Sequence, residues 1–98
     1  MFDYVKKQKV FEAAQFIVDF EKKLVDEAIS KIEEHKDRFK SENYNRHVQW
    51  AFDNEALICR FEDTIADEHL QDLINKYNWR LSRYKDSKTF AGRMKFLL

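Results

Sequence analysis

The residues whose chemistry could support catalysis or metal binding are few and widely spaced. The chain has three histidines, His35, His47 and His69, and one cysteine, Cys59. Their separations match none of the short spacings with which a helix or turn supplies two zinc ligands. Even if His47 lay across from Glu62, two ligands would not make a metal site. Cys59 has no base beside it in sequence, and we expect it to face the core as a small apolar group. The pattern predicts no metal, no cofactor and no catalytic residue.

Charge is distributed unevenly along a chain whose formal net charge is zero. Residues 51–75 hold seven acidic side chains and one arginine, a net charge of minus six. Residues 76–98 hold seven cationic side chains and one aspartate, a net charge of plus six. A basic segment rich in aromatic residues can bind phosphates or an acidic protein. Alternatively, the two segments neutralise each other within the fold or form ordinary solvated faces.

The candidate binding site is therefore the C-terminal segment. Its predicted members are Trp79, Arg80, Arg83, Tyr84, Lys85, Lys88, Arg93 and Lys95. Aromatic rings and arginines are the groups that dominate protein interfaces and that stack on nucleic-acid bases. Phe2, Tyr4 and Tyr44 join Trp79 as candidate exposed anchors. A metal-independent ribonuclease is a further alternative, but this segment contains no histidine to move protons.

A long helix must position the first third of the chain. From residue 10 to residue 39 apolar side chains recur in steps of three and four, which predicts a helix of about 30 residues, roughly 45 Å long. Its predicted buried stripe is Val10, Ala13, Ile17, Phe20, Leu24 and Ala28, widened by Phe16, Val25, Ile29 and Ile32. Residues 41–45 are turn formers that would end it. One small sheet cannot cover such a helix, so we expect its ends to pack on a second copy or on a partner.

The remaining elements are predicted from a change of period. Apolar residues alternate between 48 and 61 around a loop at 53–56, which predicts a β-hairpin with Cys59 beside Trp50. A helix is expected from Thr64 to Tyr77, ended by Asn78. Residues 79–98 are interpreted as a second hairpin that turns at 85–88 and places Arg80 opposite Arg93. A short helix over residues 89–98, capped by Ser87, fits the same apolar spacing and remains open.

These elements predict a single α+β domain over residues 1–98. The order is αββαββ, with a four-stranded, mostly antiparallel sheet, two helices on one face and a long N-terminal helix. The length suits one domain, and 44% hydrophobic residues argue against disorder. A lone cysteine fits the reducing cytoplasm, and no run approaches the roughly 20 apolar residues of a membrane span.

The absence of catalytic motifs favours a function in binding. We expect a non-enzymatic, cytoplasmic regulatory or inhibitory protein that binds another protein. In style alone it resembles small regulators and inhibitors encoded by phages and other mobile elements, which is an analogy. The alternative is nucleic-acid binding through residues 76–98, although the neutrality of the whole chain counts against it. A homodimer formed through the long first helix is a further expectation.

Overall fold

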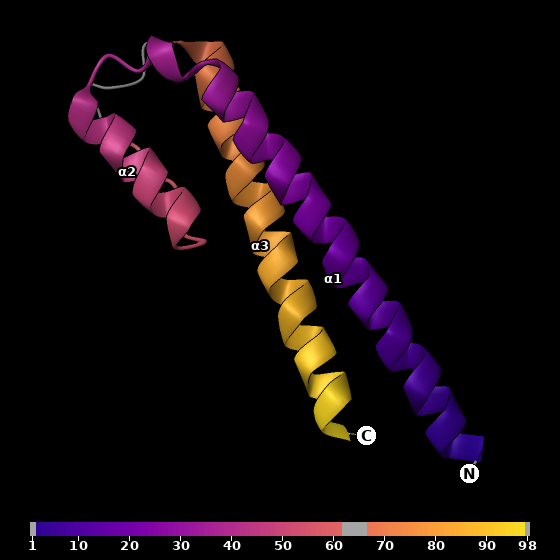
Figure 1. Ribbon diagram of the computed structural model, residues 1–98. Helices are drawn as coiled ribbons and strands as arrows, with labels where there is room; N and C mark the ends of the chain where they lie inside the picture. Colours follow the sequence, from indigo (N-terminus) through magenta and orange to yellow (C-terminus); the bar gives the residue numbers. More distant parts are fainter. Residues whose placement is uncertain (1, 62–66, 98) are drawn as a thin grey trace.

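Three helices and one short 3₁₀ turn build the part of the chain that the structure describes. The computed structural model describes residues 2–61 and 67–97. The elements are α1 (Phe2–Glu34), η1 (Lys36–Arg38), α2 (Glu42–Asp53) and α3 (Glu68–Leu97). α1 and α3 lie antiparallel along nearly their whole length, and α2 lies beside the half that is far from the chain ends (Figure 1). The result is a rod with principal extents of 59 × 18 × 17 Å.

The predicted α+β fold is wrong, because the described residues form helices and contain no strand. The first predicted hairpin, residues 48–61, is instead the end of α2 followed by an extended segment. In α2 the buried side chains are Tyr44, Val48 and Ala51, whereas Trp50 is 55% exposed. Steps of four and three therefore describe this segment better than alternation does. A run this short fits both periods, and only the packing partner decides between them.

The second predicted hairpin is also wrong, because residues 79–97 continue α3 without a break. Asn78 was expected to end a helix but lies inside α3. The alternative helix over residues 89–98 was closer, but Ser87 does not cap it: its hydroxyl donates a hydrogen bond to the Tyr84 carbonyl, as it does within a helix. With no proline and only Gly92 in this stretch, nothing forces the chain to turn.

The helix starts follow from side chains that accept backbone hydrogen bonds. Ser41 is extended and its hydroxyl accepts from the Tyr44 N–H at 3.3 Å, so the residues expected to end one helix begin the next. At the start of α3, a carboxylate oxygen of Asp67 accepts from the His69 N–H at 2.9 Å. The Arg38 guanidinium also pairs with Asp67 at 2.8 Å and links the two ends of the long helices. The predicted cap Thr64 lies outside the described residues.

The long N-terminal helix is confirmed, but its predicted core face is only partly correct: Val25, Ala28 and Ile32 are buried as expected, whereas other members of the stripe are exposed. The buried α1 side chains, each with an exposed fraction of 9% or less, are Ala14, Val18, Glu21, Val25, Ala28 and Ile32. All of them except Glu21 meet the α3 residues Leu70, Ile74, Tyr77, Leu81, Tyr84 and Ala91 in one cluster. Val10, Ile17 and Phe20, which the sequence placed in the core, are 46–53% exposed. α1 is apolar on two adjacent faces, and the sequence alone does not say which of them meets α3.

Hydrogen bonds from α3 hold α2 and the segment after it in place. The Tyr77 hydroxyl donates to the Ala56 carbonyl at 3.0 Å. The Asn78 amide bridges both backbone groups of Ile58, accepting from its N–H at 2.8 Å and donating to its carbonyl at 3.0 Å. Burial raises the pKa of Tyr77 to about 12, so this phenol stays protonated as a donor at neutral pH. These contacts place residues 56–58 against the first half of α3.

Candidate protein-binding surfaces

The eight predicted site residues all lie on α3, but the helix does not gather them into one patch. They span 17 residues, and successive side chains point about 100° apart around the axis. Tyr84 is buried, whereas Lys85, Lys88, Arg93 and Lys95 are exposed. Arg80 and Arg93 are separated by about 20 Å along the helix, so the predicted opposition of these two arginines is wrong. The local repulsion that would have called for a bound anion is absent from these two positions.

Two of the predicted arginines make contacts within the protein. The guanidinium carbons of Arg80 and Arg83 lie 4.4 and 5.2 Å from the centroid of the Trp79 ring, within cation–π range. The Arg83 Nε also donates to Glu21 on α1 at 3.4 Å. Glu21 is 7% exposed, and its second carboxylate oxygen is buried without a hydrogen-bond partner. Trp79 itself is 51% exposed, as expected for an anchor, so it remains accessible.

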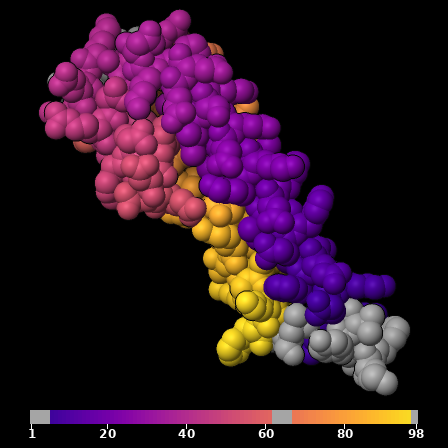
Figure 2. Space-filling view, viewed as in Figure 1, coloured from indigo at the N-terminus to yellow at the C-terminus, as the bar shows by residue number. Residues whose placement is uncertain are grey.

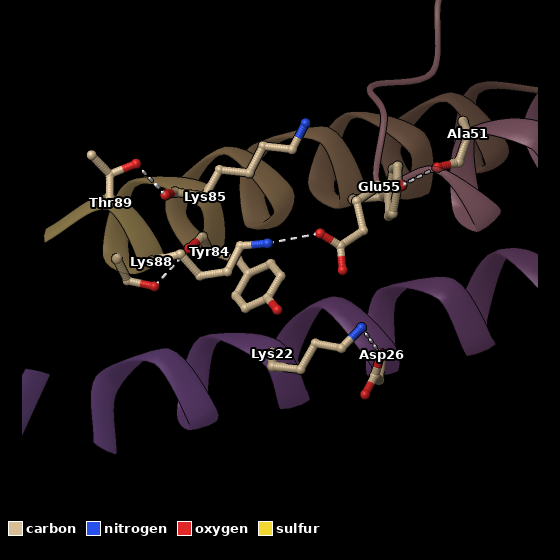
Figure 3. Close-up of polar contacts among 10 residues, drawn as sticks. Lys22, Asp26, Ala51, Glu55, Tyr84, Lys85, Lys88 and Thr89 are labelled. Carbon is tan, nitrogen blue, oxygen red and sulfur yellow. Dashed lines mark hydrogen bonds and ion pairs between the residues drawn. The ribbon is translucent and has the colours of Figure 1, made fainter. Parts of the chain in front are cut away.

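Lys88 is the point where the acidic and basic parts of the chain meet. Its ammonium lies 2.8 Å from Glu55, and its nitrogen is 4.4 Å from the Tyr84 ring centroid (Figure 3). Lys22 of α1 approaches the same ring at 5.6 Å. The hydrogen bond from Lys88 lowers the pKa of Glu55, and the same bond raises the pKa of Lys88. Internal neutralisation of the two segments, which the sequence left open, is therefore realised at this pair.

A shallow groove between α1 and α3 begins at Lys88, near the place where α2 ends. It is lined by Phe11, Gln15, Val18, Lys88, Ala91, Gly92 and Lys95, and we call it the arm groove. In the space-filling view the half of the rod nearest the chain ends has α1 and α3 without α2 beside them (Figure 2). A Cβ built at Gly92 would meet no atom within 4 Å, so there is open space at that position. Sequence reasoning missed the groove, although Gly92 is the only glycine of the chain.

The other candidate groups take structural positions. Cys59 was expected in the core but is exposed, and its N–H donates to His47 Nε2 at 3.0 Å. His35 and His69 meet edge to face with centroids 5.1 Å apart. In residues 2–61 and 67–97 no group of three histidine, cysteine or acidic side chains is arranged to hold a metal. Glu62, the suggested partner of His47, lies outside the described residues.

Of the aromatic anchors proposed from the sequence, Trp79 is exposed and Tyr44 is not. Tyr44 has 0% exposure and packs at 5.4 Å from Phe39. Burial raises the pKa of Tyr44 to about 12. The side chains of Phe2 and Tyr4 lie outside the described part of the structure. The expected anchors therefore reduce to Trp79, which lies on the side of α3 that carries the Arg83–Glu21 pair.

Comparisons with known proteins do not assign a family or a function to this chain. No helix in the described ranges has a stretch long and apolar enough to cross a membrane. No family model, no curated protein and no solved structure matches the chain.

Proposed function

We propose that this protein is a non-enzymatic binding protein that holds an acidic amphipathic helix of another protein in the arm groove. The observation that carries the proposal is that α2 and the residues directly after it lie beside α3 only as far as the Glu55–Lys88 pair. Beyond that point the arm groove runs along Phe11, Val18 and Gly92, and no third helix lies there. Helices commonly bind partner proteins by accepting an amphipathic helix in such a groove.

The packing of α2 supports a helix as the occupant of the arm groove. α2 places Tyr44, Val48 and Ala51 against the long helices, at the three- and four-residue spacing of one helix face. In the arm groove the floor is Val18 and Ala91, both nearly buried, and Gly92 adds no side chain. A second helix that continues the line of α2 would bury its apolar residues on this floor.

Charge selects an acidic partner. The Lys88 ammonium already donates a hydrogen bond to a carboxylate of the segment after α2, that of Glu55, at 2.8 Å. Lys95 lies farther along the same groove and is exposed. We define the terminal arm as residues 6–18 and 85–96. Its cationic side chains are Lys6, Lys7, Lys9, Lys85, Lys88, Arg93 and Lys95, against Glu12 and Asp86. Complementary charge speeds the encounter of partners and excludes like-charged ones.

A regulatory or inhibitory role in the cytoplasm is part of the same proposal. The exposed, unpaired Cys59 supports a reducing compartment. The arrangement of the cations supports a protein partner over the alternative, nucleic acid. They point around α3 in several directions, whereas a phosphate backbone is bound best by cations along one continuous track.

Two designed peptides test the proposal. Both carry the same helical apolar face, and their polar faces are glutamate in one and lysine in the other. Fluorescence anisotropy should show the acidic peptide binding at least about tenfold more tightly, a difference of about 1.4 kcal/mol. Gly92→Leu, which fills the groove, should weaken that binding by about tenfold or more. Gly92→Ala is the matched control, because a single Cβ meets no atom within 4 Å.

Two results would overturn the proposal. One is equal binding of the two peptides, or binding of the acidic peptide that Gly92→Leu leaves unchanged. The other is binding of random single-stranded or duplex DNA with a steep salt dependence when neither peptide binds. That outcome would assign the basic residues to nucleic acid, since each neutralised phosphate adds to the salt dependence of affinity.

A further inference from the structure

The side of the α1–α3 pair away from α2 carries a second apolar surface that the proposed function does not use. We call it the open face, and it consists of Val10, Ile17, Phe20 and Leu24 of α1 with Trp79 and Phe90 of α3. Five of these side chains are 46–53% exposed, and Leu24 is half-buried. The Arg83–Glu21 pair bridges α1 and α3 beside them. None of these six takes part in the hydrogen bonds that hold α2 and residues 54–61 in place.

The spacing of the open face is that of a helix–helix seam. On α1 the positions 10, 13, 17, 20 and 24 follow steps of three and four, with Ala13 as the small member. The buried seam of α1, which includes Ala14, Val18 and Val25, runs directly beside it. A helix with two adjacent seams is typical of a bundle in which it touches two neighbours. α3 occupies one seam of α1, and the other is uncovered in the single chain.

The open face is large enough for a stable contact. An aromatic side chain removes about 150–250 Å² from water when it is fully buried. Phe20, Trp79 and Phe90 are each about half exposed, so together they have on the order of 300 Å² of exposed surface that a partner could bury. A standard protein interface buries about 800 Å² per partner. Val10 and Ile17 add to this apolar area, and contacts by the polar side chains around the face would supply the rest. Apolar side chains together with Trp and Arg are the composition of interface centres.

Charge decides how two copies would meet. If the long helices of both copies pointed the same way, the terminal arms would lie together, each with six cationic side chains besides the Glu55-paired Lys88 and only two acidic ones. Turning one copy end to end removes this repulsion. With the two-fold axis between Ile17 and Phe20, Arg83 then lies near the partner copy's exposed Asp86, and Trp79 near the partner copy's Phe90. Both pairs lie at the same position along the rod, because the Glu21–Arg83 ion pair fixes the position of α1 along α3.

We propose that the open face binds a second copy of this chain, with α1 antiparallel to α1 of the other copy, to form a four-helix core. The interface is self-complementary, as a two-fold axis requires: Ile17 packs on Phe20 and Arg83 pairs with Asp86 in both directions. This inference is independent of the proposed function, since it uses the opposite side of the α1–α3 pair. Gly92→Leu is therefore expected to leave self-association unchanged.

Sedimentation equilibrium tests the association. The wild-type chain should be a dimer at micromolar concentration, and Phe20→Ser should raise the dimer dissociation constant by about tenfold or more. Phe96→Ser is the matched control, because Phe96 is 91% exposed on α3 and does not belong to the open face. Circular dichroism of each variant reports whether the helices are retained. A wild-type monomer at 100 µM or more, or equal effects of the two substitutions, would overturn the proposal.

Thiol crosslinking tests the orientation, in a Cys59→Ser background. Near the proposed axis, Ile17→Cys should be joined to its counterpart by a crosslinker of about 8 Å. Val10→Cys should not be joined, because the two copies of residue 10 would lie about 25 Å apart along the helices. Equal crosslinking at both positions would indicate the parallel arrangement and contradict the proposed one.

Discussion

Asn78 shows how one polar side chain can fix the course of a segment that has no secondary structure of its own. Its amide is half-buried within α3 and bridges the N–H and the carbonyl of Ile58. A side-chain amide offers both a donor and an acceptor, so it can replace a backbone partner for the extended segment. Ile58 is 4% exposed, and without Asn78 both of its polar backbone groups would lose their partners. Asn78, which the sequence predicted would end a helix, therefore holds the extended segment against α3.

Asn78→Ala is expected to lower the free energy of unfolding by about 1–3 kcal/mol, because it removes two hydrogen bonds at a partly buried site. Asn75→Ala is the control, since Asn75 is exposed on the same helix and accepts only from the Gln71 side chain. Urea unfolding of both variants measures the difference. Similar losses in the two variants would mean that the Ile58 contacts contribute little.

At the scale of elements, the ion pair between Glu55 and Lys88 joins the end of α2 to the terminal arm. Glu55 has a positive φ of 50°, in the left-handed region where the chain leaves α2. Its carboxylate thereby reaches α3, where Lys88 also lies over the Tyr84 ring. Both charged groups are about 40% exposed, so the pair contributes modestly and solvent screens it. Its importance is positional: it ends the segment that α2 covers and marks where the arm groove begins.

The Glu55–Lys88 pair predicts a loss of stability in acid. The pKa of Glu55 is lower in the folded chain than its ordinary value of 4.5, so the unfolded chain binds the proton more tightly. The stabilisation is complete above pH 4.5 and is lost as the pH falls through the lower folded pKa. Wild type should therefore be more stable than Glu55→Gln at neutral pH, and the two should converge in acid. Urea unfolding across this range measures it, with Glu12→Gln as an exposed control. A difference that does not change with pH would contradict the role of this carboxylate.

The whole molecule is a rod whose two halves have different support. In one half, α2 and residues 54–61 pack on the long helices. In the other half, the terminal arm consists of α1 and α3 alone (Figure 1). A two-helix arm buries one face of each helix and leaves the others to solvent or to partners. Both proposed binding surfaces include residues of this arm for that reason.

The rates of backbone amide hydrogen exchange should differ between the two halves of the rod. In monomeric Phe20→Ser, backbone amides of residues 8–16 and 88–96 should exchange faster than those of residues 24–32 and 70–81, because fewer buried side chains hold the arm. In the wild-type dimer the difference should shrink as the open face is covered. Uniform protection in the monomeric variant would show that α2 adds no support to its half of the rod.

The sequence predicted some of the elements and few of the contacts. The first helix was predictable because its apolar pattern persists for nearly 30 residues without glycine or proline. The helix at residues 42–53 and the continuation of α3 over residues 79–88 were missed, and residues 89–98 were left open between strand and helix. The reason is that short apolar runs such as Val48, Trp50 and Phe52 satisfy both the helical and the strand period. Among the predicted site residues, Trp79 is exposed as expected, whereas the predicted opposition of Arg80 and Arg93 depended on a hairpin that does not form.

The sequence by itself determined that the first helix is long, that its apolar stripe is wide, and that basic residues gather in the last quarter of the chain. Only the tertiary structure decided that residues 79–97 are helical, which face of α1 is buried, and that α2 stops at the start of the arm groove. The reason is physical. Helical period and charge are properties of neighbouring residues, whereas the choice between two apolar faces depends on which distant helix packs there, as α3 does on Val25 and Ala28.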